Sequence, residues 1–264
     1  MKRWHRWLFA LILLAYGVYA AVFISKTIFM AGGKPYSALF DDAMISMTYA
    51  RNLAQGYGPV WNPGDRVEGY TNPLWVVFMA GFHLLPIPEN WISLYIQIAG
   101  GVFFIASLFF VKKTAEQVSP GHAGTALLAV LLTAFYYPLS NWSLLGNEVS
   151  LLLLVTSAAV WLALRAQASG RFSPWLYVLL GASTLVRVDM AVTAVVVTGW
   201  LALFDAPNRR RHLLWGLGML ALFLGGQTVW RKAYYGEWLP MTYYLKMVGL
   251  PMLARVRRGA LAFE

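Results

Sequence analysis

The sequence has 264 residues, of which 59% are hydrophobic and 12% charged, and its mean hydropathy is +0.57. A water-soluble core of this size cannot bury so much apolar material, so the chain is predicted to cross a membrane several times. The net charge of +10 comes mostly from Lys and Arg at the ends of apolar segments, which favours a role in membrane orientation over nucleic-acid binding. The absence of Cys excludes disulfides, thiolate metal ligands and Cys nucleophiles.

The first apolar run, residues 7–30, is long enough to cross a hydrocarbon core of about 30 Å, and Lys2, Arg3 and Arg6 precede it. We therefore place the N-terminus in the cytoplasm and predict that residues 31–72 form the first extracytoplasmic loop. A cleaved signal peptide is the alternative. It is disfavoured because the apolar part exceeds the core of a signal sequence and no small-residue cleavage site follows at once.

Further apolar segments follow this loop. The segment 73–85 is short and ends at Pro86-Ile87-Pro88, so it is either a re-entrant or interfacial helix or a full crossing. The other predicted spans are 91–111, 123–137, 150–164 and 212–230, with a polar stretch at 140–148. Basic residues that mark cytoplasmic ends are Lys112, Lys113, Arg165, Arg171, Arg209, Arg210 and Arg211.

The long apolar run 176–204 is interrupted by Arg187 and Asp189, which leaves two topologies. It is either a hairpin with these charges at its outer tip or one helix with both at mid-bilayer, where each costs at least about 2.5 kcal/mol. We favour the hairpin because it obeys the positive-inside rule and brings Asp189 toward the first loop. Residues 234–246 lie outside in both versions. The predicted fold is an all-α polytopic transmembrane helical bundle with a helical first extracytoplasmic loop. It forms one domain, 1–264, in which residues 231–264 begin as an outer loop.

Four of the eleven acidic residues fall within residues 41–75. Asp41 and Asp42 are predicted to begin a helix, because residues 43–55 lack Pro and Gly and Gly56 supplies a stop. At 100° per residue the two carboxylates face different directions. They either stabilise the positive end of the helix dipole or provide a general base for a hydroxyl nucleophile.

Several other polar residues of the outer face are candidates for substrate binding. Glu68, Tyr70 and Asn72 combine a carboxylate, an aromatic ring and an amide, which suits a sugar. Arg51 and Lys34 are cations available to a lipid phosphate, although each is equally consistent with an exposed or snorkelling side chain.

Ionisable residues inside apolar runs are costly enough to suggest function. Arg187 and Asp189 meet this criterion, although they would also suit an ion pair with each other. The argument is weaker for Glu148, because this residue would also suit a solvent-exposed helix N-terminus. The four His show no metal-ligand spacing, and no Gly-rich phosphate loop or Ser-His-Asp arrangement is present. The sequence does not exclude a divalent metal bound by Asp41 and Asp42.

The run DDAMISMTYARNLAQGYGPVWNPGDRVEGYTNPLW resembles the first extracytoplasmic loop of GT-C membrane glycosyltransferases, among them the mycobacterial terminal arabinofuranosyltransferase and its bacterial relatives. Three later stretches fit the same family in the same order: LLGNEVSLLLL, TLVRVDMAV and YYGEWLPMTYYLKMVG. The resemblance extends from about residue 41 to about residue 259.

This resemblance implies a multi-pass protein of the bacterial cytoplasmic (inner) membrane, active on the extracytoplasmic side in cell-envelope synthesis. Its donor would be a polyprenyl-phosphate sugar, which is a substrate and not a cofactor, and its acceptor a glycan, lipid or protein. Asp41 would be the catalytic base, with Asp42 in support, and Arg51, Arg187 and Lys246 would stabilise the departing phosphate. No separate cofactor, resident metal or nucleic-acid partner is implied.

Two departures from the family pattern lead to an alternative. Relatives commonly carry Arg where this chain has Thr48, and they are usually much longer, so this chain is expected to be a fragment, the product of a truncated gene or a short homologue. The alternative function is that of an inactive or truncated membrane-embedded binding or assembly protein. A transporter is disfavoured because no paired repeats with matching helix breaks are visible.

Overall fold

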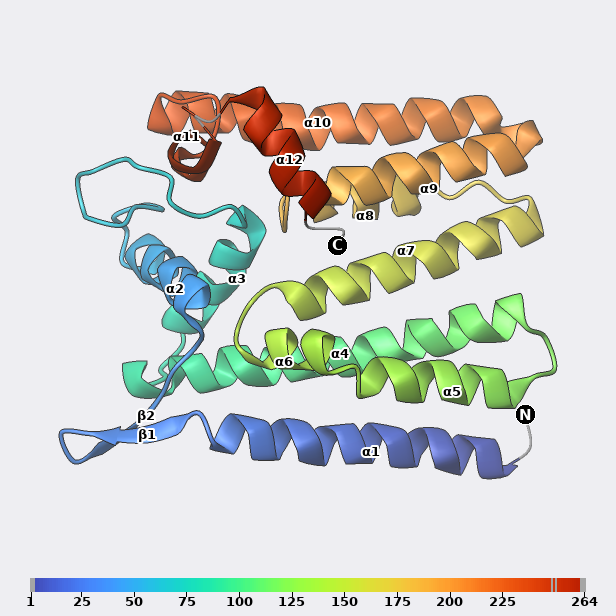
Figure 1. The fold of residues 1–264 in the computed structure, drawn as a ribbon, viewed down its shortest axis with the longest axis horizontal. Coiled ribbons are helices and arrows are strands. Elements are labelled where there is room, and N and C mark those ends of the chain that lie inside the picture. The colour runs from blue at the N-terminus through green and yellow to red at the C-terminus, as the bar shows by residue number, and fades with distance from the viewer. Residues whose placement is uncertain (1–2, 248, 250, 262–264) are drawn as a thin grey trace.

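The computed structural model describes residues 3–247, 249 and 251–261. These residues form a helical bundle with one small β-hairpin, which confirms the predicted all-α class (Figure 1). The elements are α1 (Arg3–Ser25), β1 (Ile28–Ala31), β2 (Lys34–Ser37), α2 (Asp41–Ala54), α3 (Pro73–His83), α4 (Glu89–Val118), α5 (Ala123–Ala134), α6 (Tyr137–Leu144), α7 (Val149–Ser169), α8 (Pro174–Ser183), α9 (Met190–Phe204), the 3-10 helix η1 (Ala206–Asn208), α10 (Arg209–Tyr235), α11 (Met241–Met247) and α12 (Met252–Leu261).

Among the described residues, four helical segments are long and apolar enough to cross a membrane: α1, α4, α7 and the segment from η1 through α10. The pair α5–α6 makes a fifth if its 54° bend lies within one span. The basic ends of α1, α4, α7 and α10 all lie at one end of the bundle, while α2, α3 and the β-hairpin gather at the other (Figure 1). This common placement agrees with the positive-inside rule, and the chain is a multi-pass membrane protein.

The first predicted span was wrong at its C-terminal end. Helix α1 stops at Ser25, and the residues after it form the antiparallel hairpin β1–β2 instead of helix. Gly32 and Gly33 both have positive φ, 56° and 77°, as a two-residue hairpin turn requires. The hydroxyls of Thr27 and Ser37 both donate to Oε1 of the buried Gln97, which ties the hairpin to α4.

The polar stretch 140–148 is not a loop throughout. Its first half belongs to α6, which bends away from α5 and packs closely on α4. Gly100 permits this approach, because a Cβ atom at that position would lie 2.4 Å from the backbone oxygen of Ser143. Gln97 also donates to the Leu144 carbonyl oxygen at 3.0 Å. The close packing of α4 and α6 directs the α6–α7 turn toward α2.

The run 176–204 is divided as the hairpin alternative predicts. Helices α8 and α9 are separate, and the turn between them carries Arg187 and Asp189. The opposite ends of the two helices meet near the start of α10, where Asp205, Asn208 and the loop before α8 come together. The pair therefore folds back on itself.

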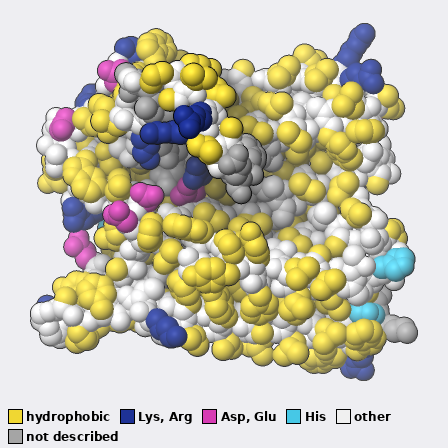
Figure 2. All heavy atoms as spheres, viewed as in Figure 1, with side chains coloured by type: hydrophobic (Ala, Val, Ile, Leu, Met, Phe, Trp, Pro, Cys, Tyr) yellow, Lys and Arg dark blue, Asp and Glu magenta, His cyan; other side chains and the backbone are white. Residues whose placement is uncertain are grey.

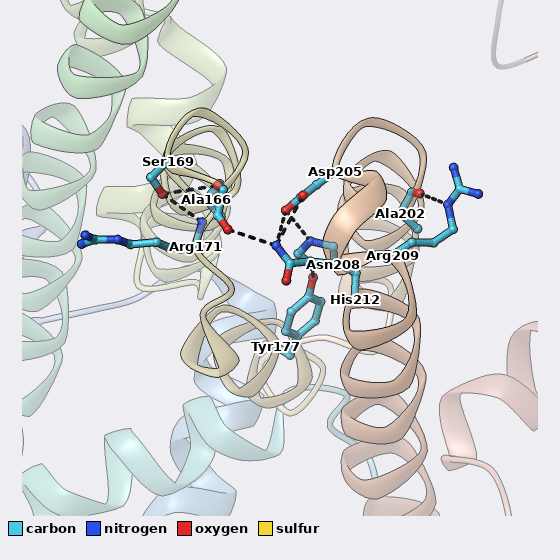
Figure 3. Close-up of polar contacts among 10 residues, drawn as sticks. Ala166, Ser169, Arg171, Tyr177, Ala202, Asp205, Asn208, Arg209 and His212 are labelled. Carbon is cyan, nitrogen blue, oxygen red and sulfur yellow. Dashed lines mark hydrogen bonds and ion pairs between the residues drawn. The ribbon is translucent and has the colours of Figure 1, made fainter.

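A buried polar network holds these ends together (Figure 3). The hydroxyl of Tyr177 hydrogen-bonds to Nδ1 of His212, and Nε2 of His212 contacts Oδ2 of Asp205 at 2.9 Å. Asn208 donates to the same Asp205 oxygen and to the Gly170 carbonyl, each at 3.1 Å. The hydrogen bond from His212, followed by that from Asn208, lowers the pKa of Asp205.

Candidate active site

The helix that carries the two acidic residues forms as the sequence predicts. Helix α2 begins at Asp41 and ends at Ala54, and Gly56 follows with a φ of 86°. Its Ala43, Met47 and Ala50 are buried in a core shared with α3. This packing fixes the orientation of α2 and leaves both Asp41 and Asp42 exposed at its first turn.

Beside this turn lies a cavity of about 900 Å³. Its walls come from α2, the segment before α3, the α6–α7 turn, the α8–α9 turn and α11. The space-filling view shows acidic side chains close to Lys and Arg side chains at this end of the molecule (Figure 2). The lining residues are Asp42, Ile45, Ser46, Gly69, Tyr70, Thr71, Asn72, Trp142, Asn147, Glu148, Val149, Arg187, Thr242, Tyr243 and Lys246.

Five of the nine residues predicted for the site line this cavity: Asp42, Tyr70, Asn72, Arg187 and Lys246. They come from four segments that are far apart in the sequence, so the fold brings together what the sequence only suggests. The charged groups of the lining are two carboxylates and two cations.

The other four predicted residues lie outside the lining. Asp41 is exposed next to Asp42 but does not line the cavity. Arg51 is exposed in the last turn of α2, and the Asp189 side chain is 63% exposed and pairs with Arg187 at 3.1 Å. Glu68 is buried.

Glu68 connects the first loop to α10. Its Oε2 accepts from Nε of the buried Arg231, and its backbone oxygen accepts from the Met241 amide at 3.1 Å. Burial raises the pKa of the Glu68 carboxyl, and the hydrogen bond from Arg231 opposes that shift. In this structure Glu68 therefore positions the start of α11, which supplies part of the cavity wall.

Tyr70 is buried and lines the cavity wall, but its hydroxyl is already engaged by another side chain. Its OH lies 3.0 Å from the OH of Tyr235, which donates to the Pro59 carbonyl at 2.6 Å. The Tyr70 ring also meets Tyr49 edge-on, with ring centroids 4.8 Å apart. Burial raises the pKa of Tyr70, so the hydroxyl stays protonated.

A hydrogen-bonded chain runs along one wall of the cavity. Ser46 donates to Oδ1 of Asn72 at 3.1 Å, and Nδ2 of Asn72 donates to Glu148 at 2.9 Å. The other oxygen of Glu148 lies 3.4 Å from Nη1 of Arg187. Glu148 thus orients both a predicted binding amide and a predicted binding cation.

Glu148 was only a weak candidate in the sequence, and Ser46 was not among the predicted site residues. Glu148 had a usable signal, since it is an isolated acidic residue between apolar runs. Ser46 had no such signal in the sequence, because its role depends on a hydrogen bond to Asn72 that only the folded structure brings about. No group of three or more His, Cys, Asp or Glu suited to a metal is found within the described part of the chain.

Two curated proteins match this chain. A terminal beta-(1->2)-arabinofuranosyltransferase of Corynebacterium glutamicum is 32% identical over 239 residues, covering 78% of this chain and 32% of the relative. The enzyme of the same name from Mycobacterium tuberculosis is 26% identical over 224 residues, covering 78% of this chain and 34% of the relative. The chain is a homologue of these enzymes.

The match confirms the resemblance found in the sequence motifs. The chain spans about a third of the length of the curated relatives it matches. No protein-family model and no solved structure matches it.

Proposed function

We propose that this chain serves a GT-C glycosyltransferase that moves a sugar of the arabinofuranose type from a polyprenyl-phosphate donor to an extracytoplasmic glycan, lipid or protein. The observation that carries the proposal is the convergence of Asp42, Glu148, Arg187 and Lys246 on one cavity at the end of a membrane bundle. The homology to arabinofuranosyltransferases supports the choice of sugar. The bacterial cytoplasmic membrane, with the cavity on its outer side, is the proposed location.

The two cations suit the donor phosphate. Arg187 offers a planar guanidinium for phosphate oxygens, and Lys246 offers a second positive charge on the α11 wall. As the bond between the sugar and the phosphate oxygen breaks, charge grows on the phosphate, and fixed cations stabilise that charge. A phosphate also leaves readily without a general acid, so one base suffices.

The base removes the proton of the acceptor hydroxyl as the new glycosidic bond forms. We propose Asp42 for this role because it is the member of the acidic pair that lines the cavity. Asp41, which the family resemblance favours, stays a prediction. A cavity at the boundary of the apolar bundle lets the sugar phosphate meet its acceptor in water while the polyprenyl chain stays in the bilayer.

The acidic pair offers a direct test. The chain is expressed in bacterial membranes, and transfer is measured from polyprenyl-phosphate arabinofuranose with a labelled sugar. Asp42→Asn is expected to lower transfer by about 10²- to 10⁴-fold, the usual contribution of a general base. The matched control is Asp65→Asn, an exposed residue of the same loop that does not line the cavity.

The Asp41→Asn variant separates the two carboxylates. We expect it to keep transfer within about tenfold of the wild type, since only its support of the helix start is lost. A collapse of transfer in Asp41→Asn with full activity in Asp42→Asn would assign the base to Asp41. Absence of transfer by the wild type with a panel of polyprenyl-phosphate sugars would favour a binding or assembly role.

A further inference from the structure

A second cavity, of about 550 Å³, lies between α3 and α10. Its lining is almost wholly apolar and aromatic: Leu53, Pro59, Tyr70, Pro73, Leu74, Val76, Val77, Leu185, Gly226, Gln227, Trp230 and Tyr234. Val77 and Trp230 at its edge are 56% and 40% exposed. The groove therefore opens on the outer surface of the bundle, and Tyr70 is the only described residue that lines both cavities.

One lining residue is out of place in such a groove. Gln227 is 6% exposed, yet neither Nε2 nor Oε1 of its amide has a hydrogen-bond partner among the described residues. Burying an amide without partners is unfavourable, because its hydrogen bonds to water are lost and not replaced. The groove thus presents one donor and one acceptor that a ligand with both functions would satisfy.

The lining also limits the charge of the occupant. No charged side chain of the described residues lines this groove, whereas Arg187 and Lys246 line the first cavity. An anionic head group would be desolvated here with no counter-charge in the lining itself, since the guanidinium of Arg66 lies outside it, 4.7 Å from the Tyr234 ring centroid. A plain isoprenoid chain fits the apolar walls but leaves the Gln227 amide unsatisfied. The lining is therefore complementary to an uncharged head on an apolar body.

The position of the groove along α10 suits the polar–apolar boundary expected near the end of a membrane-spanning helix. Gln227 is eight residues before the end of α10 at Tyr235, a rise of about 12 Å. Trp230 and Tyr234 stack with ring centroids 5.5 Å apart between these two points. Trp and Tyr concentrate where head groups meet acyl chains, which is also where the ester and hydroxyl groups of glycerolipids lie.

We infer that this groove is a binding site for an uncharged, hydroxyl-bearing glycerolipid of the diacylglycerol class, separate from the donor cavity. The Gln227 Nε2 donates to an ester oxygen of the lipid, and Oε1 accepts from its free hydroxyl. The acyl chains follow the groove between α3 and α10 toward the bilayer. The site does not depend on the proposed transferase activity.

The glycines of α10 allow a matched pair of variants. An added Cβ at Gly225 or Gly226 meets no heavy atom within 4 Å, so both positions accept a larger side chain. Only Gly226 lines the groove. Gly226→Leu fills the groove, and Gly225→Leu is the control. Gln227→Leu removes the amide and keeps the volume.

The probe is diacylglycerol with a photoactivatable diazirine in one acyl chain, added to the purified protein in phosphatidylcholine nanodiscs. Saturable labelling of α3 and α10 peptides is measured by mass spectrometry, relative to labelling of the lipid-facing α1. We expect labelling in the wild type and in Gly225→Leu, its loss in Gly226→Leu, and about tenfold weaker binding in Gln227→Leu. The melting temperature of Gln227→Leu is expected to stay unchanged or to rise, because the amide has no hydrogen-bond partner to lose within the described part of the chain.

Three results would overturn the inference. Equal labelling of Gly226→Leu and the wild type would show that the groove is not the site. Competition by polyprenyl phosphate as strong as that by unlabelled diacylglycerol would assign the groove to the donor chain. A markedly lower melting temperature of Gln227→Leu, with no saturable labelling of the wild type, would show that polypeptide satisfies the amide.

Discussion

Replacement of Arg187 by Met tests whether this cation acts on substrate or only neutralises its neighbour. Arg187 pairs with the exposed Asp189 at 3.1 Å and with the buried Glu148 at 3.4 Å. The variant keeps a side chain of similar length but leaves the Glu148 carboxylate with only the hydrogen bond from Asn72 among the described residues. Two effects are expected, one on stability and one on transfer.

The stability effect is estimated from the contact between Arg187 and Glu148. At 3.4 Å, Coulomb's law gives about 1 kcal/mol in water and about 5 kcal/mol at an effective dielectric constant of about 20. The Arg187 side chain is 44% exposed, so solvent screening places the loss near the lower figure, at about 1 to 2 kcal/mol. Loss of a cation that stabilises a leaving phosphate lowers transfer by about 10²- to 10³-fold.

The double variant Arg187→Met with Glu148→Gln separates these effects. Removing the unpaired carboxylate is expected to restore the melting temperature, while transfer from polyprenyl-phosphate arabinofuranose stays low. Arg171→Met, at an exposed position outside the cavity lining, is the control and is expected to change neither quantity by much. Recovery of both transfer and stability in the double variant would refute a direct role for Arg187 in transfer. Its role would then be limited to neutralising the charge of Glu148.

Two further predictions concern the scaffold. Gly100→Ala is expected to lower stability by about 1 to 3 kcal/mol through its clash with the Ser143 backbone, whereas Gly101→Ala, whose nearest neighbour lies at 3.6 Å, should be neutral or slightly stabilising in thermal melts. Asp205→Asn should cost about 1.5 to 3 kcal/mol at pH 7, because a charged acceptor of hydrogen bonds is lost. The pKa of Asp205 is lowered in the folded state, so the stability that its carboxylate contributes is fully present above about pH 3.8 and is lost as the pH falls through the folded-state pKa. A difference in unfolding free energy between wild type and variant that grew below pH 3.8 would contradict this reasoning.

Local signals accounted for much of the fold. The start of α2 at Asp41 and its end before Gly56 followed from residue types alone, as did the break of the run 176–204 at Arg187. The hairpin after α1 was missed because its apolar residues continue the hydropathy of the helix. The adjacent Gly32 and Gly33 were the sequence feature that indicated a hairpin turn instead of a continued helix.

The site was less accessible to sequence reasoning, because it depends on contacts between distant segments. Both Asp41 and Asp42 suit a base, and only the packing of α2 on α3 decides which one lines the cavity. Glu68 resembled a sugar ligand, but its partner Arg231 lies 163 residues away in the sequence. The link from Asn72 to Glu148 spans 76 residues and left no local pattern to detect.

The equal numbers of carboxylates and cations around the first cavity have a consequence for turnover. In the proposed transfer, Asp42 loses its negative charge when it takes the acceptor proton, and the phosphate gains one when the sugar leaves. The sum over donor, acceptor and lining is therefore the same before and after the reaction. Charge moves across the cavity from the α2 wall toward Arg187 and Lys246, and no counter-ion has to enter or leave in the chemical step.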